Sequence, residues 1–257
     1  MARIFITGSA DGLGQLAAKE LINLGHHVVL HARNNERGKQ ALAKVPGADS
    51  VLIADLSSID ETKALASEAN ALGTFDAIIH NAGVYRVSNN SVSADGLPLA
   101  FAVNSLAPYI LTCLIQKARR VIYLSSGMHL QGNPNLDNLP TGTNKGSCHV
   151  SYSDTKLHDL IMSMGVARKW TDVCANAVDP GWVPTKMGGA GAPGNLEKGF
   201  QTQVWLAVSD DPGATVSGHY FHHKTQVHYL PAAGYAPVQE KFITLCEQIT
   251  GVRFKYC

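Results

Sequence analysis

Tyr152 and Lys156 are the two residues whose types and spacing could do acid–base chemistry. They open a stretch of mixed apolar and polar residues that predicts a helix to about Arg168. Residues four apart share one face of a helix, so the ammonium group should lie beside the phenol. A neighbouring positive charge lowers the tyrosine pKa from about 10 towards neutral pH, where the group can act as a general acid or base. The pair also fits a solvated helix face, and other features of the chain must distinguish the two.

Length, composition and charge limit the class of protein. The chain has 257 residues, an apolar fraction of 45%, a formal net charge of +1 and no run of like charges. These values predict a soluble globular protein with a small-molecule partner, and argue against nucleic acid or a membrane surface. Apolar residues 4–6 leave no room for a signal peptide, and no stretch reaches about 18 apolar residues, so no membrane span and a cytoplasmic location are expected. Five cysteines without paired spacing indicate reduced thiols.

Short apolar runs alternate with helical periodicity along the chain. Strands are expected at residues 3–7, 28–31, 50–54, 76–80, 121–124, 173–178 and 218–221, and helices at 13–24, 36–43, 60–72, 99–117 and 152–168. This alternation predicts an α/β fold with a Rossmann-type, doubly wound, mostly parallel seven-stranded sheet and helices on both faces. Because no linker or change of composition interrupts it, residues 1–257 are expected to form one domain.

A glycine-rich turn follows the first predicted strand. Its residues are Gly8, Ser9, Asp11, Gly12, Leu13 and Gly14. Glycines at these positions allow a tight turn and let a pyrophosphate approach the amides at the start of the next helix. The alternative is a purely structural turn, but the strand before it and the helix after it favour a dinucleotide-binding site.

Arg33 follows the second predicted strand, where an NAD enzyme is expected to carry an acidic residue. Its planar guanidinium can instead pair with the 2′-phosphate of NADP. NADP(H) is therefore the favoured cofactor, with NAD(H) as the alternative. A plain surface arginine on a tight connection is the non-functional interpretation of the same residue.

Three motifs together resemble those of the single-domain short-chain dehydrogenases/reductases. They are the glycine turn, the His-Asn-Ala-Gly segment at residues 80–83 and the Tyr-Ser-Asp-Thr-Lys segment at residues 152–156, in the family's order and spacing. The resemblance covers nearly the whole chain, and residues 123–129 and 245–252 are similar to the retinol-dehydrogenase-like group of that family.

The resemblance implies a catalytic set of Asn104, Ser126, Tyr152 and Lys156. In such enzymes the serine holds the substrate carbonyl and the tyrosine transfers the proton. The lysine lowers the tyrosine pKa and holds the nicotinamide ribose, and the asparagine holds a water of the proton relay. Ser126 also satisfies an independent expectation, because it follows the fifth predicted strand at the edge where open α/β sheets bind ligands.

Further cofactor contacts are implied by the same resemblance. They are Asp55, Leu56, Asn81, Ala82, Gly83, Tyr152, Lys156, Pro180, Gly181, Val183 and Thr185. A helix N-cap is an equally good interpretation of Asp55. His80 departs from the asparagine usual at its position, which changes the local hydrogen bonding but not the turn.

Residues 127–146 and 186–200 are expected to be the substrate loops. The first is rich in glycine, asparagine and proline, and the second begins with small side chains that have little to bury, so it is expected to form a mobile lid. The histidines of residues 219–228 could form a metal site, but carboxylates are lacking nearby in the sequence, and no metal is expected. The connection at residues 116–120 is shorter than in many family members, and the preceding helix commonly forms the family's dimer face. The shortening therefore weakens the expectation of the usual homo-oligomer, although a homo-oligomer stays possible.

The sequence therefore favours an NADP(H)-dependent oxidoreductase that reduces a ketone or aldehyde to an alcohol, or performs the reverse reaction, with Tyr152 as acid or base. The alternative is a non-catalytic dinucleotide-sensing protein on the same fold. The presence of Asn104, Ser126, Tyr152 and Lys156 together argues against that alternative.

Overall fold

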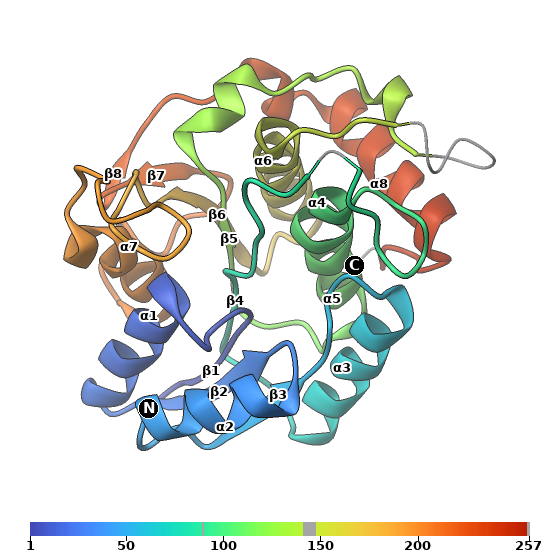
Figure 1. The fold of residues 1–257 in the computed structure, drawn as a ribbon. Coiled ribbons are helices and arrows are strands. Elements are labelled where there is room, and N and C mark those ends of the chain that lie inside the picture. Colours follow the sequence, from blue (N-terminus) through green and yellow to red (C-terminus); the bar gives the residue numbers. More distant parts are fainter. Residues whose placement is uncertain (89, 141–147, 256–257) are drawn as a thin grey trace.

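The structure, a computed structural model, describes residues 1–88, 90–140 and 148–255. Its strands are β1 (Arg3–Ile6), β2 (His27–Ala32), β3 (Ser50–Ile53), β4 (Ala77–His80), β5 (Arg120–Leu124), β6 (Cys174–Asp179), β7 (Tyr220–His222) and β8 (Thr225–Gln226). They form one sheet in the order β3-β2-β1-β4-β5-β6-β7-β8, in which β1 to β7 run parallel (Figure 1). The doubly wound, mostly parallel sheet expected from the sequence is confirmed.

The sheet has eight strands, one more than the seven expected. The additional β8 pairs antiparallel with β7 across a tight turn at His223 and Lys224, whose φ angles are 50° and 64°. Thr225 and Gln226 are both exposed, so β8 lacks the apolar alternation by which a strand is recognised in a sequence.

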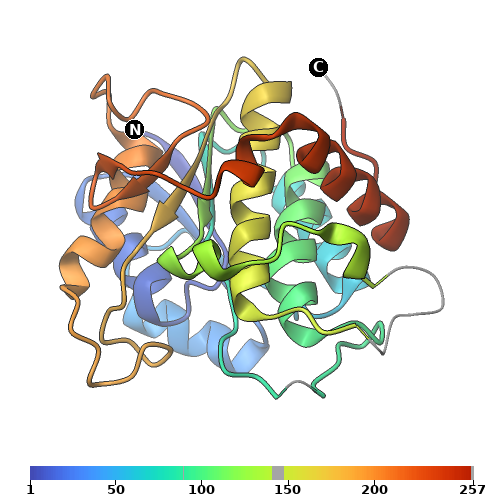
Figure 2. The same ribbon diagram turned by 90° about the horizontal axis from the view of Figure 1, so that it is seen from above.

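Helices cover both faces of the sheet (Figure 2). One face carries α1 (Gly12–Asn23), α2 (Asn35–Lys44) and α7 (Leu196–Val208). The other carries α3 (Ile59–Ala71), α4 (Leu99–Phe101), α5 (Ala107–Leu114) and α6 (Tyr152–Lys169), with α8 (Ala236–Thr250) packed against α6. α7 and α8 lie outside the predicted helices, although each buries apolar residues at helical spacing, such as Phe242, Ile243 and Cys246 in α8.

The helix expected at residues 99–117 is divided into three parts. A π-helical turn at Ala102–Leu106 separates α4 from α5, and α5 ends at Leu114. Pro108 explains the interruption, because it has no N–H to donate to the carbonyl of Asn104 four residues earlier. Such turns occur often at functional sites, and this one contains Asn104.

The central strands are buried on both faces. In β1, Phe5 packs with the cluster under α3 and α5, while Ile4 and Ile6 pack with the cluster under α1 and α7. All three side chains are fully buried. Because the parallel strands end at one edge of this rigid sheet, residues that follow them are brought together there. Among the described residues, no helix combines the length and apolar character needed to cross a membrane.

Candidate active site

Several predicted site residues follow directly after parallel strands, whose carboxyl ends lie at one edge of the sheet. Gly8 lies after β1, Arg33 after β2, Asp55 after β3, Asn81 after β4, Ser126 after β5 and Pro180 after β6. The strand order reverses between β1 and β4. In doubly wound sheets, ligands bind at the carboxyl ends of the strands beside such a reversal.

The glycine turn lets other groups come close to its backbone. Gly8 has φ +64°, and a Cβ there would lie 2.7 Å from the Ala82 Cα. A Cβ on Gly14 would lie 2.3 Å from the Asn81 Nδ2, so both positions exclude any side chain. Gly12, with φ +57°, has no atom within 4 Å of its Cβ position. This open space beside the first amides of α1 fits a pyrophosphate.

Neighbouring side chains hold this turn in place. The Gly8 amide donates to His31 Nδ1 at 3.0 Å, and burial lowers the pKa of His31 to about 4, so the ring is neutral and able to accept. Ser9 is buried, and its Oγ donates to the Ile6 carbonyl. Asn81 Nδ2 donates to the carbonyl oxygens of Thr7 and Gly8, at 2.9 and 3.1 Å. Ser9 and Asn81 therefore support the turn through their side chains.

His80, which replaces the usual asparagine, is buried at the end of β4. Its Nε2 lies 3.1 Å from the Thr112 hydroxyl, and its ring stacks on Tyr123 with centroids 4.9 Å apart. Burial lowers the pKa of His80 to about 3, so the ring stays neutral. Asn81, Ala82 and Gly83 follow the strand as irregular backbone and do not form the turn expected from the sequence.

Arg33 is exposed, and a second arginine that is absent from the predicted set lies near it. Arg37, in the first turn of α2, forms an ion pair with Asp11 of the glycine turn. Asn34 lies between them and caps α2 by accepting from the Arg37 amide. Arg37 follows Arg33 by four residues, and this spacing is the signal that could have identified it.

Asp55 forms a local turn rather than a helix N-cap. Its Oδ1 accepts from the Ser57 amide at 2.9 Å, whereas Ser58 caps α3. The N-cap interpretation is therefore wrong by three residues, because the chain makes an extra turn before the helix starts. The Leu56 side chain is buried between the two, in the cluster under α3.

Tyr152 is the first residue of α6, and Lys156 lies one turn further along the same helix. Ser151 and Asp154 cap this helix reciprocally. The Lys156 Nζ lies 5.5 Å from the centroid of the Tyr152 ring. Lys156 is buried, and its Nζ also donates to the Leu124 carbonyl at 2.6 Å.

Asp159 is absent from the predicted set, although it holds Lys156. The Lys156 Nζ donates to its carboxylate at 2.8 Å, and the two side chains are only 6% and 4% exposed. Burial raises the pKa of Asp159 to about 6, while Lys156 opposes the rise. Burial lowers the pKa of Lys156, but Asp159 and Tyr152 raise it, and the net direction is upward. The pair is thus charged at neutral pH. Its i,i+3 spacing is the signal in the sequence.

The pKa of Tyr152 differs from the sequence-based expectation. Burial raises it, and this effect outweighs the lowering by the Lys156 ammonium. The expected contribution of Lys156 is present, but the tyrosine is more buried than a helix start would suggest. Tyr152 is therefore a protonated phenol at neutral pH.

Asn104 lies beside Lys156 in the fully buried π-helical turn. A Cβ on Gly83 would lie 3.5 Å from the Asn104 Oδ1 and 3.8 Å from the Lys156 Nζ. The Asn104 amide donates to the Val84 carbonyl and the Thr155 hydroxyl, both at 3.0 Å, and its Oδ1 accepts from the Val84 amide at 2.8 Å. Both amide protons are therefore used, and Asn104 fixes the backbone that leaves β4.

Two adjacent serines after β5 behave differently. Ser125 is buried, and its hydroxyl donates to the Lys156 carbonyl at 2.7 Å. Ser126 is half-buried, and its Oγ accepts from the Met128 amide at 3.2 Å. A hydroxyl that accepts this bond keeps its proton for another partner, so Ser126 rather than Ser125 is able to donate to a ligand.

After β6, Pro180 is followed by Gly181, whose φ is +78°. Val183 is buried, and the Thr185 Oγ1 accepts from the Gly188 amide at 3.1 Å. Its hydroxyl proton remains available to a ligand.

The expected substrate loops are partly regular structure. Residues 196–200 are the first turn of α7, so the second loop ends at Asn195. Its glycines allow close contact: a Cβ on Gly188 or Gly194 would lie 2.1 or 2.4 Å from the carbonyl oxygens of Val183 and Trp182. The first loop contains 3₁₀ helices at Gly127–Gln131 and Leu136–Asn138, and its residues 141–147 lie outside the described residues.

The histidine-rich segment packs at the end of β7. The rings of His222 and His223 lie 3.7 Å apart, and the His222 Nδ1 lies 3.5 Å from the Asp179 Oδ2. In the part of the chain that the structure describes, no group of three or more His, Cys, Asp or Glu side chains is arranged to hold a metal ion.

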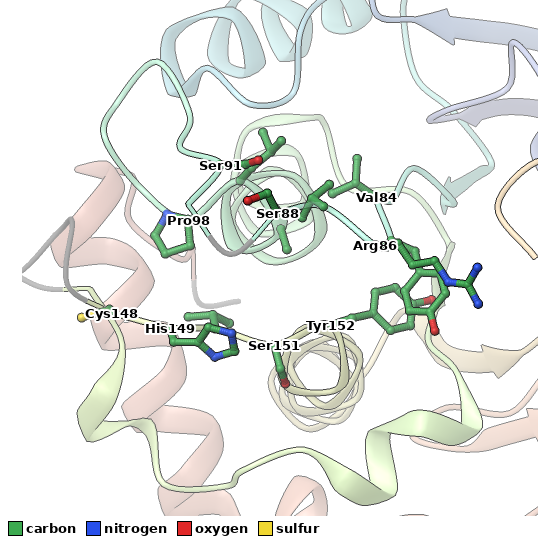
Figure 3. Close-up of a pocket in the computed structure, with 14 residues that line it drawn as sticks. Val84, Arg86, Ser88, Ser91, Pro98, Cys148, His149, Ser151 and Tyr152 are labelled. Carbon is green, nitrogen blue, oxygen red and sulfur yellow. The ribbon is translucent and has the colours of Figure 1, made fainter.

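A pocket of about 200 Å³ opens beside Tyr152 (Figure 3). One wall is formed by residues 84–88, 91 and 98–100, which follow β4, and the other by residues 148–152 at the start of α6. Tyr85 contacts Tyr152 directly, with ring centroids 4.6 Å apart. Arg86 and Tyr152 lie at the same end of the pocket in Figure 3. Neither Tyr85 nor Arg86 belongs to the predicted set, and no pattern in the sequence marks them.

Comparisons with known proteins agree with this geometry. A family model described as short chain dehydrogenase matches residues 2–137. An uncharacterized oxidoreductase of Emericella nidulans is 44% identical over 98% of this chain and 98% of its own length. The short-chain dehydrogenase chyC of Penicillium rubens is 41% identical over 98% of this chain and 99% of its own. The crystal structure of an uncharacterized protein from Mycobacterium paratuberculosis is similar with a TM-score of 0.83 and 25% identity, covering 99% of this chain and 95% of that one.

Proposed function

The chain belongs to the short chain dehydrogenase family, oxidoreductases that act on CH–OH and C=O groups, and from that premise we propose that it is an NADP(H)-dependent enzyme that interconverts a small ketone or aldehyde and its alcohol. The observation that carries the proposal is the position of Tyr152. Tyr152 is one of the residues that line the pocket, and the buried Lys156 ammonium lies 5.5 Å from the centroid of its ring. An acid is thereby placed where a substrate carbonyl can enter.

The strand-end residues fit a dinucleotide. The open space beside Gly12 and the first amides of α1 accept a pyrophosphate, and Arg33 with Arg37 provides positive charge for a 2′-phosphate. In this proposal the remaining crevice is lined by Asp55, Leu56, Asn81, Ala82, Gly83, Pro180, Gly181, Val183 and Thr185. When bound, NADPH supplies the hydride for the carbonyl carbon.

In this proposal, Ser126 and Tyr152 contact the carbonyl oxygen of the substrate. Ser126 keeps its hydroxyl proton free, so it donates a hydrogen bond to the carbonyl oxygen and orients it. Burial raises the pKa of Tyr152, which keeps the phenol protonated and ready to transfer its proton to that oxygen. The raised pKa favours the reduction direction at neutral pH.

Lys156 and Asn104 support the acid. Two of the three ammonium protons of Lys156 are used by Leu124 and Asp159, and the third is available to a ribose hydroxyl. The backbone carbonyl of Asn104 has no α-helical donor, because residue 108 is a proline without an N–H. This backbone oxygen is therefore suited to hold a water that returns protons to the site.

Incubation with NADPH and a panel of small aldehydes, ketones and quinones tests the function directly. We expect consumption of NADPH with at least one carbonyl and formation of the matching alcohol, followed by absorbance and product analysis. NADPH binding in calorimetry without turnover of any carbonyl would favour a dinucleotide-sensing protein instead.

The cofactor preference depends on Arg33 and Arg37. Replacing either by Ala is expected to weaken NADPH binding by about tenfold to a hundredfold and leave NADH binding unchanged, because only NADPH carries the 2′-phosphate. Calorimetric titration of both cofactors measures the difference. Lys39→Ala, which removes an exposed cation further along α2, is the control. An equal loss for both cofactors would contradict a phosphate contact.

A further inference from the structure

The pocket beside Tyr152 has an asymmetric distribution of charge. Arg86 lines it, whereas none of its lining residues is aspartate or glutamate. The rest of the lining is apolar or polar, and it includes His149 and the hydroxyls of Ser88, Ser91 and Ser151. A cation with hydroxyl donors and no competing carboxylate is a suitable environment for an anionic oxygen group.

The backbone of Arg86 is held in an unusual conformation. Its φ is 54°, in the left-handed region that few residues other than glycine adopt. Such conformations cost free energy and are concentrated at ligand sites. The Arg86 guanidinium carbon lies over the Tyr85 ring, 5.3 Å from the ring centroid. Arg86 is exposed, and its guanidinium lies over Tyr85 at one end of the pocket (Figure 3).

Arg86 is also available for a ligand. Among the described residues it has no carboxylate partner, whereas Arg37, Arg120, Arg168 and Arg253 each lie within ion-pair distance of one. Tyr85 connects it to the reacting end of the pocket, because its ring contacts the guanidinium on one side and the Tyr152 ring, at 4.6 Å, on another. Arg86 is therefore separated from the proposed acid by a single side chain.

We infer that Arg86 binds a carboxylate of the substrate, and that the substrate is a small oxo acid whose carboxylate lies a few bonds from the carbonyl beside Tyr152. This inference rests on the proposed carbonyl chemistry. The pocket volume of about 200 Å³ is below the roughly 300–1,000 Å³ typical of sites for drug-sized ligands, which favours a short chain. Val84, Val87 and Leu99 supply apolar contacts for the carbons between the two groups.

The test compares matched acids and esters. Reduction of 2-oxobutanoate, 4-oxopentanoate and 5-oxohexanoate, and of their methyl esters, is measured with NADPH in wild type and in Arg86→Gln, which keeps the stem and Cβ but removes the charge. We expect kcat/KM for the best acid to fall by about tenfold to a hundredfold in the variant, while the value for its ester changes less than about threefold. Arg86→Lys should restore part of the loss, because it keeps the charge without the planar fork. Arg253→Ala, an exposed cation near the C-terminus, controls for net charge.

Two outcomes would overturn the carboxylate site. An equal loss for acid and ester would show that Arg86 acts by holding Tyr85, and no loss for either would show that it contacts no substrate. Calorimetry with the same oxo acids on wild type and Arg86→Gln gives a measurement independent of turnover. If wild type binds an oxo acid through Arg86 but reduces no carbonyl, the proposed reaction fails and the site stands; if it reduces esters as well as acids in both proteins, the reaction stands and the site fails.

Discussion

Replacing Tyr152 by Phe is expected to lower kcat/KM for carbonyl reduction by roughly 10²- to 10⁴-fold while leaving NADPH affinity within about twofold. The phenol oxygen is the only atom removed, and with it the proton that the substrate oxygen must receive. The aromatic ring remains to contact Tyr85 and to lie 5.5 Å from the Lys156 ammonium, so the pocket keeps its shape. A loss confined to turnover is the sign of a group that acts in the transition state.

Steady-state kinetics with the best carbonyl of the panel, together with calorimetric titration of NADPH, measures the two quantities. Tyr235→Phe is the matched control, because Tyr235 is 62% exposed and lies at the start of α8, outside the pocket. That variant should behave as wild type. Retention of wild-type turnover in Tyr152→Phe would remove the tyrosine from the reaction and with it the proposed acid.

The sheet could be predicted from the sequence because its strands are short, apolar and buried on both faces. The seven parallel strands were expected within one or two residues of their observed ends, since glycine, proline and polar residues bound each apolar run. The β8 strand was not predicted, because its two exposed polar residues show no alternation of apolar and polar side chains. α7 and α8 were also not predicted, although the apolar residues of their buried faces do recur at helical spacing.

The positions of the candidate site residues were predictable where a motif coincides with a strand end, and much less so where they depend on three-dimensional contact. Gly8, Gly12 and Gly14 follow from the geometry of a tight strand-to-helix turn, and the structure gives each a steric reason or an open space. Residues that lie beside the motifs only in the folded protein could not be predicted in this way. Arg86 becomes interesting only through a left-handed φ and a contact with Tyr85 that no spacing rule contains.

The pKa of Tyr152 could likewise be predicted only in part from the sequence. The spacing of Tyr152 and Lys156 predicts that the ammonium lowers the tyrosine pKa, and it does, but burial raises that pKa by more. Burial depends on how α6 packs against its neighbours, which sequence periodicity does not express as a magnitude. The direction of one contribution could therefore be predicted, and the net direction could not.

Asp159 is the residue whose replacement should change the pH dependence most. The pKa of Lys156 is lowered by burial and raised by Asp159 and Tyr152, and the net direction is upward. Asp159→Asn keeps the shape but removes the negative charge at 2.8 Å from the Lys156 Nζ. Burial then dominates, and the pKa of Lys156 should fall below its ordinary value of 10.5. We expect the alkaline loss of carbonyl reduction to begin at least about one pH unit earlier in the variant than in wild type.

The stability of the two proteins should depend on pH in opposite ways. In wild type the folded-state pKa of Lys156 is raised, so its contribution is complete below pH 10.5 and is lost only as pH rises through the folded-state value. In Asp159→Asn the folded-state pKa is lowered, so the unfolded chain binds more protons between that value and 10.5. The free energy of unfolding of the variant should therefore rise with pH in that window, by up to about 1.4 kcal/mol per pH unit relative to wild type.

Urea unfolding of both proteins between pH 7 and 10 measures this difference. Asp159 itself adds no slope there, because its pKa, raised by burial to about 6, leaves it ionised throughout. Asp137→Ala is a suitable control, since that carboxylate is 68% exposed and its ion pair with Lys241 should contribute at most about 1 kcal/mol without a pH slope in this range. A stability difference between wild type and Asp159→Asn that stays constant from pH 7 to 10 would mean that Asp159 does not maintain the charge of Lys156. The ammonium beside Tyr152 would then depend on Tyr152 and the Leu124 carbonyl alone.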